Sequence, residues 1–160
     1  MFAIPWYVVL FVSIPESFLI IILGLALFNL EIPYKKAGLI SVISAICSYF
    51  VRQLPVIFGL HTLIGVLVLT GLLIWLGKVK PWEALISISG GFVIYFLLES
   101  FLLPLFFLIT SKNQEIFVID PRYCIVYFVP IAVITVLLYF ILKKYHLYIY
   151  DLKAGKNESE

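Results

Sequence analysis

Five long apolar segments, joined by short links that carry charges and prolines, constrain this chain more than any other feature. A membrane-spanning helix needs about 20 mostly apolar residues. The segments that meet this need lie at about residues 6–30, 37–57, 58–77, 82–109 and 124–142 of the 160-residue chain. In lipid a helix bonds all its backbone groups within its own segment. We therefore expect an all-α, polytopic membrane protein, a bundle of five transmembrane helices.

The composition points to the bilayer as the solvent of this chain. Hydrophobic residues make up 64% of it and charged residues 12%, with a mean hydropathy of +1.16. A soluble domain is about 45–50% apolar and about 25% charged. A chain this short could not bury so much apolar surface in water, because much of a small domain lies on its outside. The lipid bilayer is thus an expected partner, whereas a net charge of +2 gives no basis for nucleic-acid binding.

The distribution of basic residues predicts the orientation. Five spans put the termini on opposite sides of the membrane. With the amino terminus outside, eight of the eleven lysines and arginines face the cytoplasm, namely Lys35, Lys36, Lys78, Lys80, Lys143, Lys144, Lys153 and Lys156. The positive-inside rule therefore predicts a multi-pass protein of the cell membrane with its amino terminus out and its carboxyl terminus in.

Two regions follow from this topology. Residues 1–145 form the five-helix transmembrane domain, and residues 146–160 form a cytoplasmic amphipathic stretch with a polar tail. Over residues 143–153 we expect a short helix that lies on the inner membrane surface, with its lysines among the lipid headgroups.

Ionisable side chains inside the spans are the candidate functional residues. They are Glu16, Arg52 and Glu99, with His61 near the start of the third span. Each such group costs roughly 2.5–3.5 kcal/mol on the insertion scale. At a rise of 1.5 Å per residue, Glu16 and Glu99 lie roughly 15 Å below the outer surface, Arg52 about 8 Å below it and His61 near the boundary. All four residues therefore fall in the outer half of the membrane.

This outer-half cluster has two interpretations. The planar guanidinium of an arginine can bond two carboxylates. In the first interpretation Arg52 neutralises Glu16 or Glu99 and holds the helices together, as polar contacts between membrane helices commonly do. In the second, the cluster is a pocket open to the outside that binds a ligand or a proton. Two carboxylates and one arginine leave one negative charge unless one carboxylate is protonated.

Prolines and glycines mark expected irregularities. Pro15 is expected to break the first helix at the depth of the cluster. The segment between Pro55 and Gly59 is either a capped, proline-broken hairpin or a re-entrant element that lines the pocket. In the fourth span, Gly90–Gly91 and Pro104 are expected points of bending or close packing.

The sequence gives little indication of a catalytic site or a cofactor-binding site. The two histidines, His61 and His146, are predicted on opposite faces of the membrane, which disfavours a bis-histidine haem. The cysteines Cys47 and Cys124 lie in apolar stretches and suggest neither a disulfide framework nor a metal site. The chain has no HExxH and no GxSxG motif. We expect a non-enzymatic protein with no catalytic residues, no metal site and no cofactor.

Four short features carry a resemblance to known proteins: Ile14-Pro15-Glu16, Arg52-x-Leu54-Pro55, Phe58-Gly59-x-His61-Thr62 and Glu99. They resemble features of uncharacterised multi-span membrane proteins of Gram-positive bacteria. More distantly, the layout of residues 1–145 is similar to the transmembrane sensor domain of peptide-sensing histidine kinases of the AgrC type. Such kinases carry a cytoplasmic dimerisation and ATP-binding module after the last helix. Since 18 residues follow Leu142, we expect no kinase activity from this chain.

These features favour a role in signal transduction. The leading hypothesis is a signal-sensing or partner-binding subunit that works with a separate output protein in the cytoplasm or membrane, or as a homo-oligomer. A small proton-coupled transporter, or a subunit of one, with a carboxylate as its proton site is the alternative. A third hypothesis is a structural subunit of a larger membrane complex.

Overall fold

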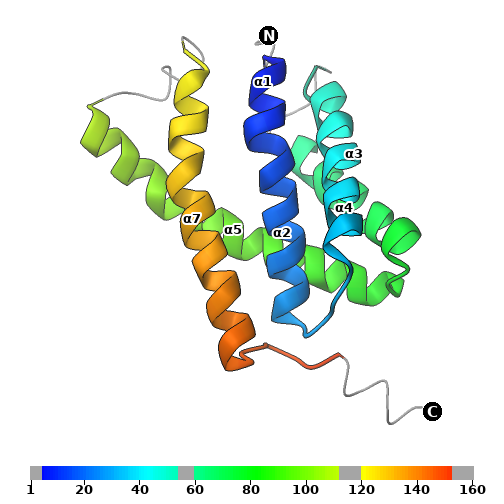
Figure 1. Ribbon diagram of the computed structural model, residues 1–160. Helices are drawn as coiled ribbons and strands as arrows, with labels where there is room; N and C mark the ends of the chain where they lie inside the picture. Colours follow the sequence, from blue (N-terminus) through cyan, green and yellow to red (C-terminus); the bar gives the residue numbers. More distant parts are fainter. Residues whose placement is uncertain (1–4, 54–59, 112–119, 153–160) are drawn as a thin grey trace, which may run out of the picture.

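The computed structural model describes residues 5–53, 60–111 and 120–152, and for residues 52, 53, 60 and 61 it describes the backbone alone. The elements are α1 (Trp6–Val8), η1 (Val9–Ser13), α2 (Ile14–Leu27), α3 (Tyr34–Gln53), α4 (Leu60–Gly77), α5 (Pro81–Thr110) and α7 (Arg122–Tyr145). The first three form one continuous helical column (Figure 1). A helix thus lies over each of the five apolar segments, and the described parts of the chain contain no strand. The predicted all-α class is confirmed.

Three of these helices are long and apolar enough to cross a membrane. They are the first column, α5 and α7, over Trp6–Leu27, Pro81–Thr110 and Arg122–Tyr145. Helix α4 contains a shorter apolar stretch, Thr62–Gly77. Helix α3 carries two lysines in its first turn. The structure therefore has the helix lengths and hydropathy of a membrane protein.

Helix α2 is the central element of the bundle. It packs against α3, α5 and α7, while α3 pairs with α4, and α4 and α7 each contact α5. Figure 1 shows α2 between α7 and α3, with α5 passing obliquely behind it. A helix that is apolar on every side is expected in a core. The buried residues of α2 are accordingly Leu19, Ile20, Ile21, Ile22, Leu23, Gly24, Leu25 and Leu27.

The crossing of α2 and α5 depends on glycines. A Cβ atom on Gly24 would overlap the carbonyl oxygen of Ser87, and one on Gly91 would lie 2.9 Å from the Cα of Gly24. A Cβ on Gly90 would lie 2.9 Å from the ring of Phe28. Small residues allow membrane helices to approach this closely. The expected close packing at Gly90–Gly91 is confirmed, and α5 stays helical through Pro104.

The expected break at Pro15 is wrong. Pro15 lies in the first turn of α2, and the chain before it remains helical as the π-helical turn η1. Proline has no N–H to donate, and its ring crowds the carbonyl four residues earlier. A π-helical turn widens the helix locally and absorbs such a defect. The helix therefore passes Pro15 without ending.

Four helix ends carry a left-handed residue that is not glycine. Asn29, Lys78, Ser111 and His146 have φ angles of 53°, 57°, 52° and 52°. After α2, the Leu30 N–H donates to the Leu25 carbonyl at 2.9 Å. After α7, the Leu147 N–H donates in the same way to Leu142 at 3.0 Å. These bonds satisfy carbonyls at the helix ends, as in the Schellman motif.

The chain after α7 does not form the expected surface helix. Residues 147–152 are not helical, so the prediction over residues 143–153 is wrong beyond Tyr145. Instead this segment lies across the end of α2. The Ile149 N–H donates to the Leu27 carbonyl at 2.8 Å, and the Asn29 side chain donates to Asp151 at 3.0 Å. The last carbonyls of a helix need donors from outside the helix, and this segment supplies one.

Candidate functional site

Four polar side chains gather where α2, α5 and α7 meet: Glu16, Tyr95, Glu99 and Tyr127. We call them the junction cluster. The Tyr95 side chain is 3% exposed, and both glutamates are half-buried. The hydroxyl of Tyr95 lies within electrostatic range of both carboxylates. The structure thus brings Glu16 of α2 and Glu99 of α5 to the same region, around one tyrosine.

Tyr127 ties α7 to this region. Its hydroxyl donates to the backbone carbonyl of Glu99 at 3.0 Å. Its ring meets the ring of Phe106 edge-on, with 5.2 Å between the centroids. Such ring pairs contribute about 0.5–1.5 kcal/mol beyond their buried area. Tyr127 therefore holds α7 against α5 beside the carboxylates.

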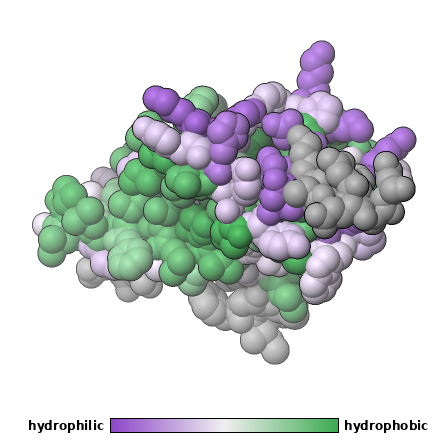
Figure 2. All heavy atoms as spheres, turned by 90° about the horizontal axis from the view of Figure 1, so that it is seen from below, coloured by the Kyte–Doolittle hydropathy of each residue, from purple (hydrophilic) through white to green (hydrophobic). Residues whose placement is uncertain are grey.

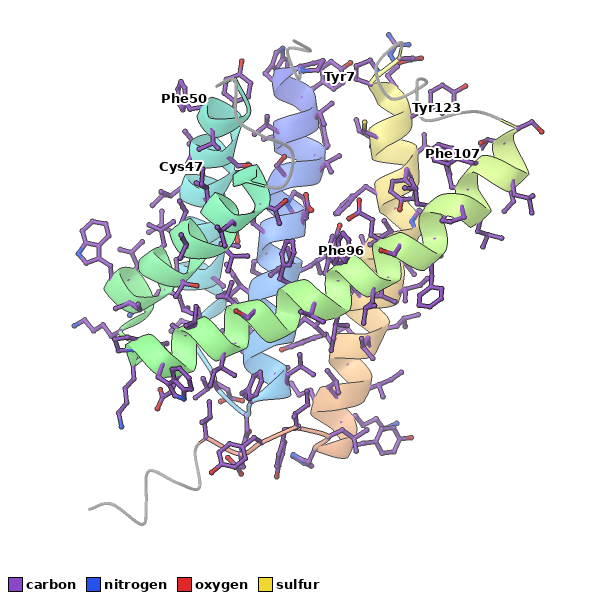
Figure 3. The ribbon with its side chains drawn as sticks, turned by 180° about the vertical axis from the view of Figure 1, so that it is seen from behind. Tyr7, Cys47, Phe50, Phe96, Phe107 and Tyr123 are labelled. Carbon is purple, nitrogen blue, oxygen red and sulfur yellow. The ribbon has the colours of Figure 1, made fainter. Side chains whose placement is uncertain are left out.

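Aromatic residues near the ends of three helices mark a level from which the position of the junction cluster can be measured. Figure 3 shows Tyr7, Phe50 and Tyr123 at the same end of the molecule. Aromatic residues at a shared level are typical of a membrane interface. With a rise of 1.5 Å per residue, Tyr127 lies about 6 Å and Glu16 about 13 Å along their helices from that level. This spacing is compatible with a position between one interface and the midplane.

Arg52 and His61 complete the predicted cluster, but their side chains lie outside the described residues. The backbone of Arg52 belongs to the last turn of α3, and that of His61 to the first turn of α4. Helix α3 packs against both α2 and η1. Arg52 thus lies on a helix next to the one that carries Glu16, and its pairing with a carboxylate remains a prediction. The segment from Pro55 to Gly59 also lies outside the described residues.

Tyr95 and Tyr127 were not among the cluster residues predicted from the sequence. Tyr95 precedes Glu99 by four residues, which puts both side chains on one face of a helix. That spacing could have indicated, from the sequence alone, that Tyr95 lies beside Glu99. Tyr127 gave no such signal, because its contact with Glu99 spans 28 residues of sequence.

Several other buried polar groups in the bundle are bonded within their own helices. The hydroxyl of Ser41 donates to the Ala37 carbonyl at 2.7 Å, and that of Thr135 donates to the Ile131 carbonyl at 2.8 Å. Such bonds to the preceding turn satisfy hydroxyls in apolar surroundings. These two hydroxyls are therefore satisfied without a ligand.

A second feature lies at the opposite end of α2. A cavity of about 500 Å³ is bounded by the end of α2, the link to α3 and the last turns of α7. We call it the α2–α7 cavity. Tyr34 and Tyr139 share a hydrogen bond of 2.8 Å on its wall, and the Lys143 ammonium donates to the Tyr34 hydroxyl at 3.4 Å. The hydrogen bond with Tyr139 lowers the pKa of Tyr34 most, and the bond from Lys143 lowers it further.

Metal binding and known relatives add no constraint on the site. Within residues 5–53, 60–111 and 120–152, no group of three or more histidine, cysteine, aspartate or glutamate side chains could hold a metal ion. Comparisons of the chain with protein-family models, curated proteins and solved structures find no match.

Proposed function

We propose that this protein is a multi-pass protein of the cell membrane that senses a signal or binds a partner and has no enzymatic activity. In this proposal all five helices cross the membrane, with the amino terminus out and the carboxyl terminus in. The lysines support this orientation, since Lys35, Lys78, Lys80, Lys143 and Lys144 are exposed near helix ends. Figure 2, seen from the end that carries the carboxyl-terminal segment, shows hydrophilic side chains gathered beside a broad apolar surface.

The observation that carries the sensing role is the junction cluster itself. Carboxylates of α2 and α5 lie near one buried tyrosine, and Tyr127 bonds α7 to α5 at the same place. A ligand for two carboxylates and two hydroxyls carries a positive charge or several hydrogen-bond donors. The ligand acts as a signal if it binds one arrangement of these helices more tightly than another.

Helix α7 provides the route from the cluster to the far end of the molecule. The same helix that carries Tyr127 continues to Tyr145, and the segment after it is hydrogen-bonded to the end of α2. A small shift of α7 against α2 therefore changes how residues 146–152 are held. In this proposal a separate output protein, or a second copy of the chain, recognises that change.

Co-purification tests this function. The full chain is purified in mild detergent as wild type, Glu16→Gln, Glu99→Gln and Glu83→Gln, and co-eluting proteins are identified. Glu83 is a half-buried carboxylate in the first turn of α5, outside the cluster, and serves as the control. We expect one partner to accompany wild type and Glu83→Gln but to be depleted from both cluster variants. Equal recovery with all four proteins would overturn the sensing role and favour a structural subunit.

The same carboxylates favour a second candidate, a small proton-coupled transporter. Ionisable residues within membrane helices are rare and often mark proton paths. Vesicles with an imposed pH gradient and a trapped pH indicator distinguish the two functions. A sensor leaves the decay of the gradient unchanged, whereas a transporter accelerates it in wild type and not in Glu99→Gln.

A further inference from the structure

The α2–α7 cavity joins an apolar interior to a charged rim. Ile22 and Leu25 of α2 and Leu142 of α7 line its apolar part, and Glu31, Tyr34 and Lys143 line its polar part. Both helices are candidate membrane spans, and the charged residues lie at their ends. The cavity therefore runs from the depth of the hydrocarbon to the level of the headgroups. A volume of about 500 Å³ is within the range of about 300–1,000 Å³ found for small-molecule sites.

The rim presents one positive and one negative side chain. The Lys143 ammonium lies 3.9 Å from the Glu31 carboxylate, and the two side chains are 53% and 65% exposed. A long, exposed ion pair of this kind contributes little to stability. A ligand that offers a phosphate to Lys143 and an ammonium to Glu31 replaces this pair at little cost. A purely anionic ligand would be attracted by Lys143 but repelled by Glu31.

The walls of the cavity are built by contacts between distant parts of the chain. The Tyr34–Tyr139 hydrogen bond joins α3 to α7 over 105 residues of sequence. His146 and Tyr148 form a further wall, and the bond from Ile149 to the Leu27 carbonyl keeps their segment at the end of α2. The site is therefore a formed cavity in the folded chain and not a charged surface alone.

We propose that the α2–α7 cavity binds a glycerophospholipid with a zwitterionic headgroup, from the membrane leaflet at that end of the bundle. The phosphate lies against Lys143 and the Tyr34 hydroxyl, the ammonium lies against Glu31, and the first part of an acyl chain lies along Leu25 and Leu142. The site is at the opposite end of α2 from the junction cluster, so its lining residues are separate from those proposed to bind the signal.

The neighbour of Lys143 provides a matched control. Lys144 has the same charge and is also exposed, but its ammonium lies 5.7 Å from the centre of the Tyr145 ring and it does not line the cavity. A general attraction of surface lysines for lipid would therefore affect both variants equally. A specific site in the cavity would affect Lys143→Gln alone.

Native mass spectrometry of the full chain tests the proposal. The protein is purified in mild detergent and mixed with equal amounts of phosphatidylethanolamine and phosphatidylglycerol. We expect wild type and Lys144→Gln to retain phosphatidylethanolamine in preference to phosphatidylglycerol. Lys143→Gln should lower that retention about tenfold, because a charged hydrogen bond is lost. Glu31→Gln should remove the preference between the two lipids.

A change of cavity shape tests the same site without a change of charge. Ala26 lines the cavity, so Ala26→Leu should narrow it and lower lipid retention while the circular dichroism spectrum stays helical. Equal retention of the two lipids by wild type would overturn the proposal. Losses of the same size in Lys143→Gln and Lys144→Gln would also overturn it, as would unchanged retention in both Lys143→Gln and Ala26→Leu.

Discussion

The hydroxyl of Tyr127 on α7 donates to the backbone carbonyl of Glu99 on α5 at 3.0 Å. This bond joins the last helix of the bundle to the helix that carries one of the two carboxylates of the junction cluster. Tyr127 is also buried, with 7% of its surface exposed. The bond therefore links the stability of the α5–α7 contact to the geometry of the junction cluster.

Tyr127→Phe should destabilise the protein by about 0.5–1.5 kcal/mol, the usual net contribution of one hydrogen bond. The free energy of unfolding in detergent measures this change. Tyr123→Phe, one turn earlier on α7, is the control, and we expect it to change stability by less than about 0.5 kcal/mol. Equal effects of the two substitutions would contradict the assigned role of the bond.

Gly24→Ala should destabilise the α2–α5 crossing by about 1–3 kcal/mol, because the added methyl group overlaps the carbonyl oxygen of Ser87. Gly71→Ala is the matched control in another helix, since a Cβ at Gly71 meets nothing within 4 Å. Alanine is the better helix former, so this control should be neutral or slightly stabilising. Thermal unfolding in detergent gives both values. A crossing that tolerates Gly24→Ala as well as Gly71→Ala would show that the helices are not in close contact.

Arg52→Leu should cost about 3–5 kcal/mol if the arginine is paired within the bundle, because its removal leaves a carboxylate charge in apolar surroundings. Adding Glu16→Gln or Glu99→Gln should then recover part of the loss. A double-mutant cycle in unfolding free energy identifies the carboxylate that pairs with Arg52. Wild-type stability of Arg52→Leu would mean that the arginine reaches the outer surface instead.

The orientation of the chain has a direct chemical test. In a background with Cys47→Ser and Cys124→Ser, Asn113→Cys should react with a membrane-impermeant thiol reagent added outside intact cells. Gly155→Cys should react only after the membrane is opened, because the positive-inside rule puts the carboxyl terminus in the cytoplasm. The reverse pattern of labelling would invert the topology.

The segment after α7 should come away from α2 when its side-chain bond is removed. Asp151→Ala deletes the acceptor of the 3.0 Å bond from Asn29. We expect faster hydrogen exchange at the Ile149 amide, which bonds to the Leu27 carbonyl. An amide in the middle of α2, such as that of Leu23, serves as the internal control and should be unchanged.

The amino-acid sequence by itself determined where the helices lie and how apolar they are. In lipid each backbone group must be satisfied within its own segment, so apolar length alone decides where a helix lies. For this reason the five apolar segments each coincide with a helix. The Gly90–Gly91 pair also indicated close packing, because small residues let membrane helices approach one another. Glu16 and Glu99 stood out because ionisable residues are rare in such apolar segments.

Only the tertiary structure decided which helices are neighbours and how they end. Contacts between membrane helices rest on close packing and single polar bonds, and these join residues that are far apart in sequence. Tyr127 therefore joined the cluster without a sequence signal, and Tyr34 met Tyr139 across 105 residues. Lys78 and His146 end their helices in the left-handed conformation, which neither residue type predicts. The carboxyl-terminal segment adds His146 and Tyr148 to the wall of the α2–α7 cavity, because a carbonyl at the end of α2 accepts the Ile149 amide and holds the segment there.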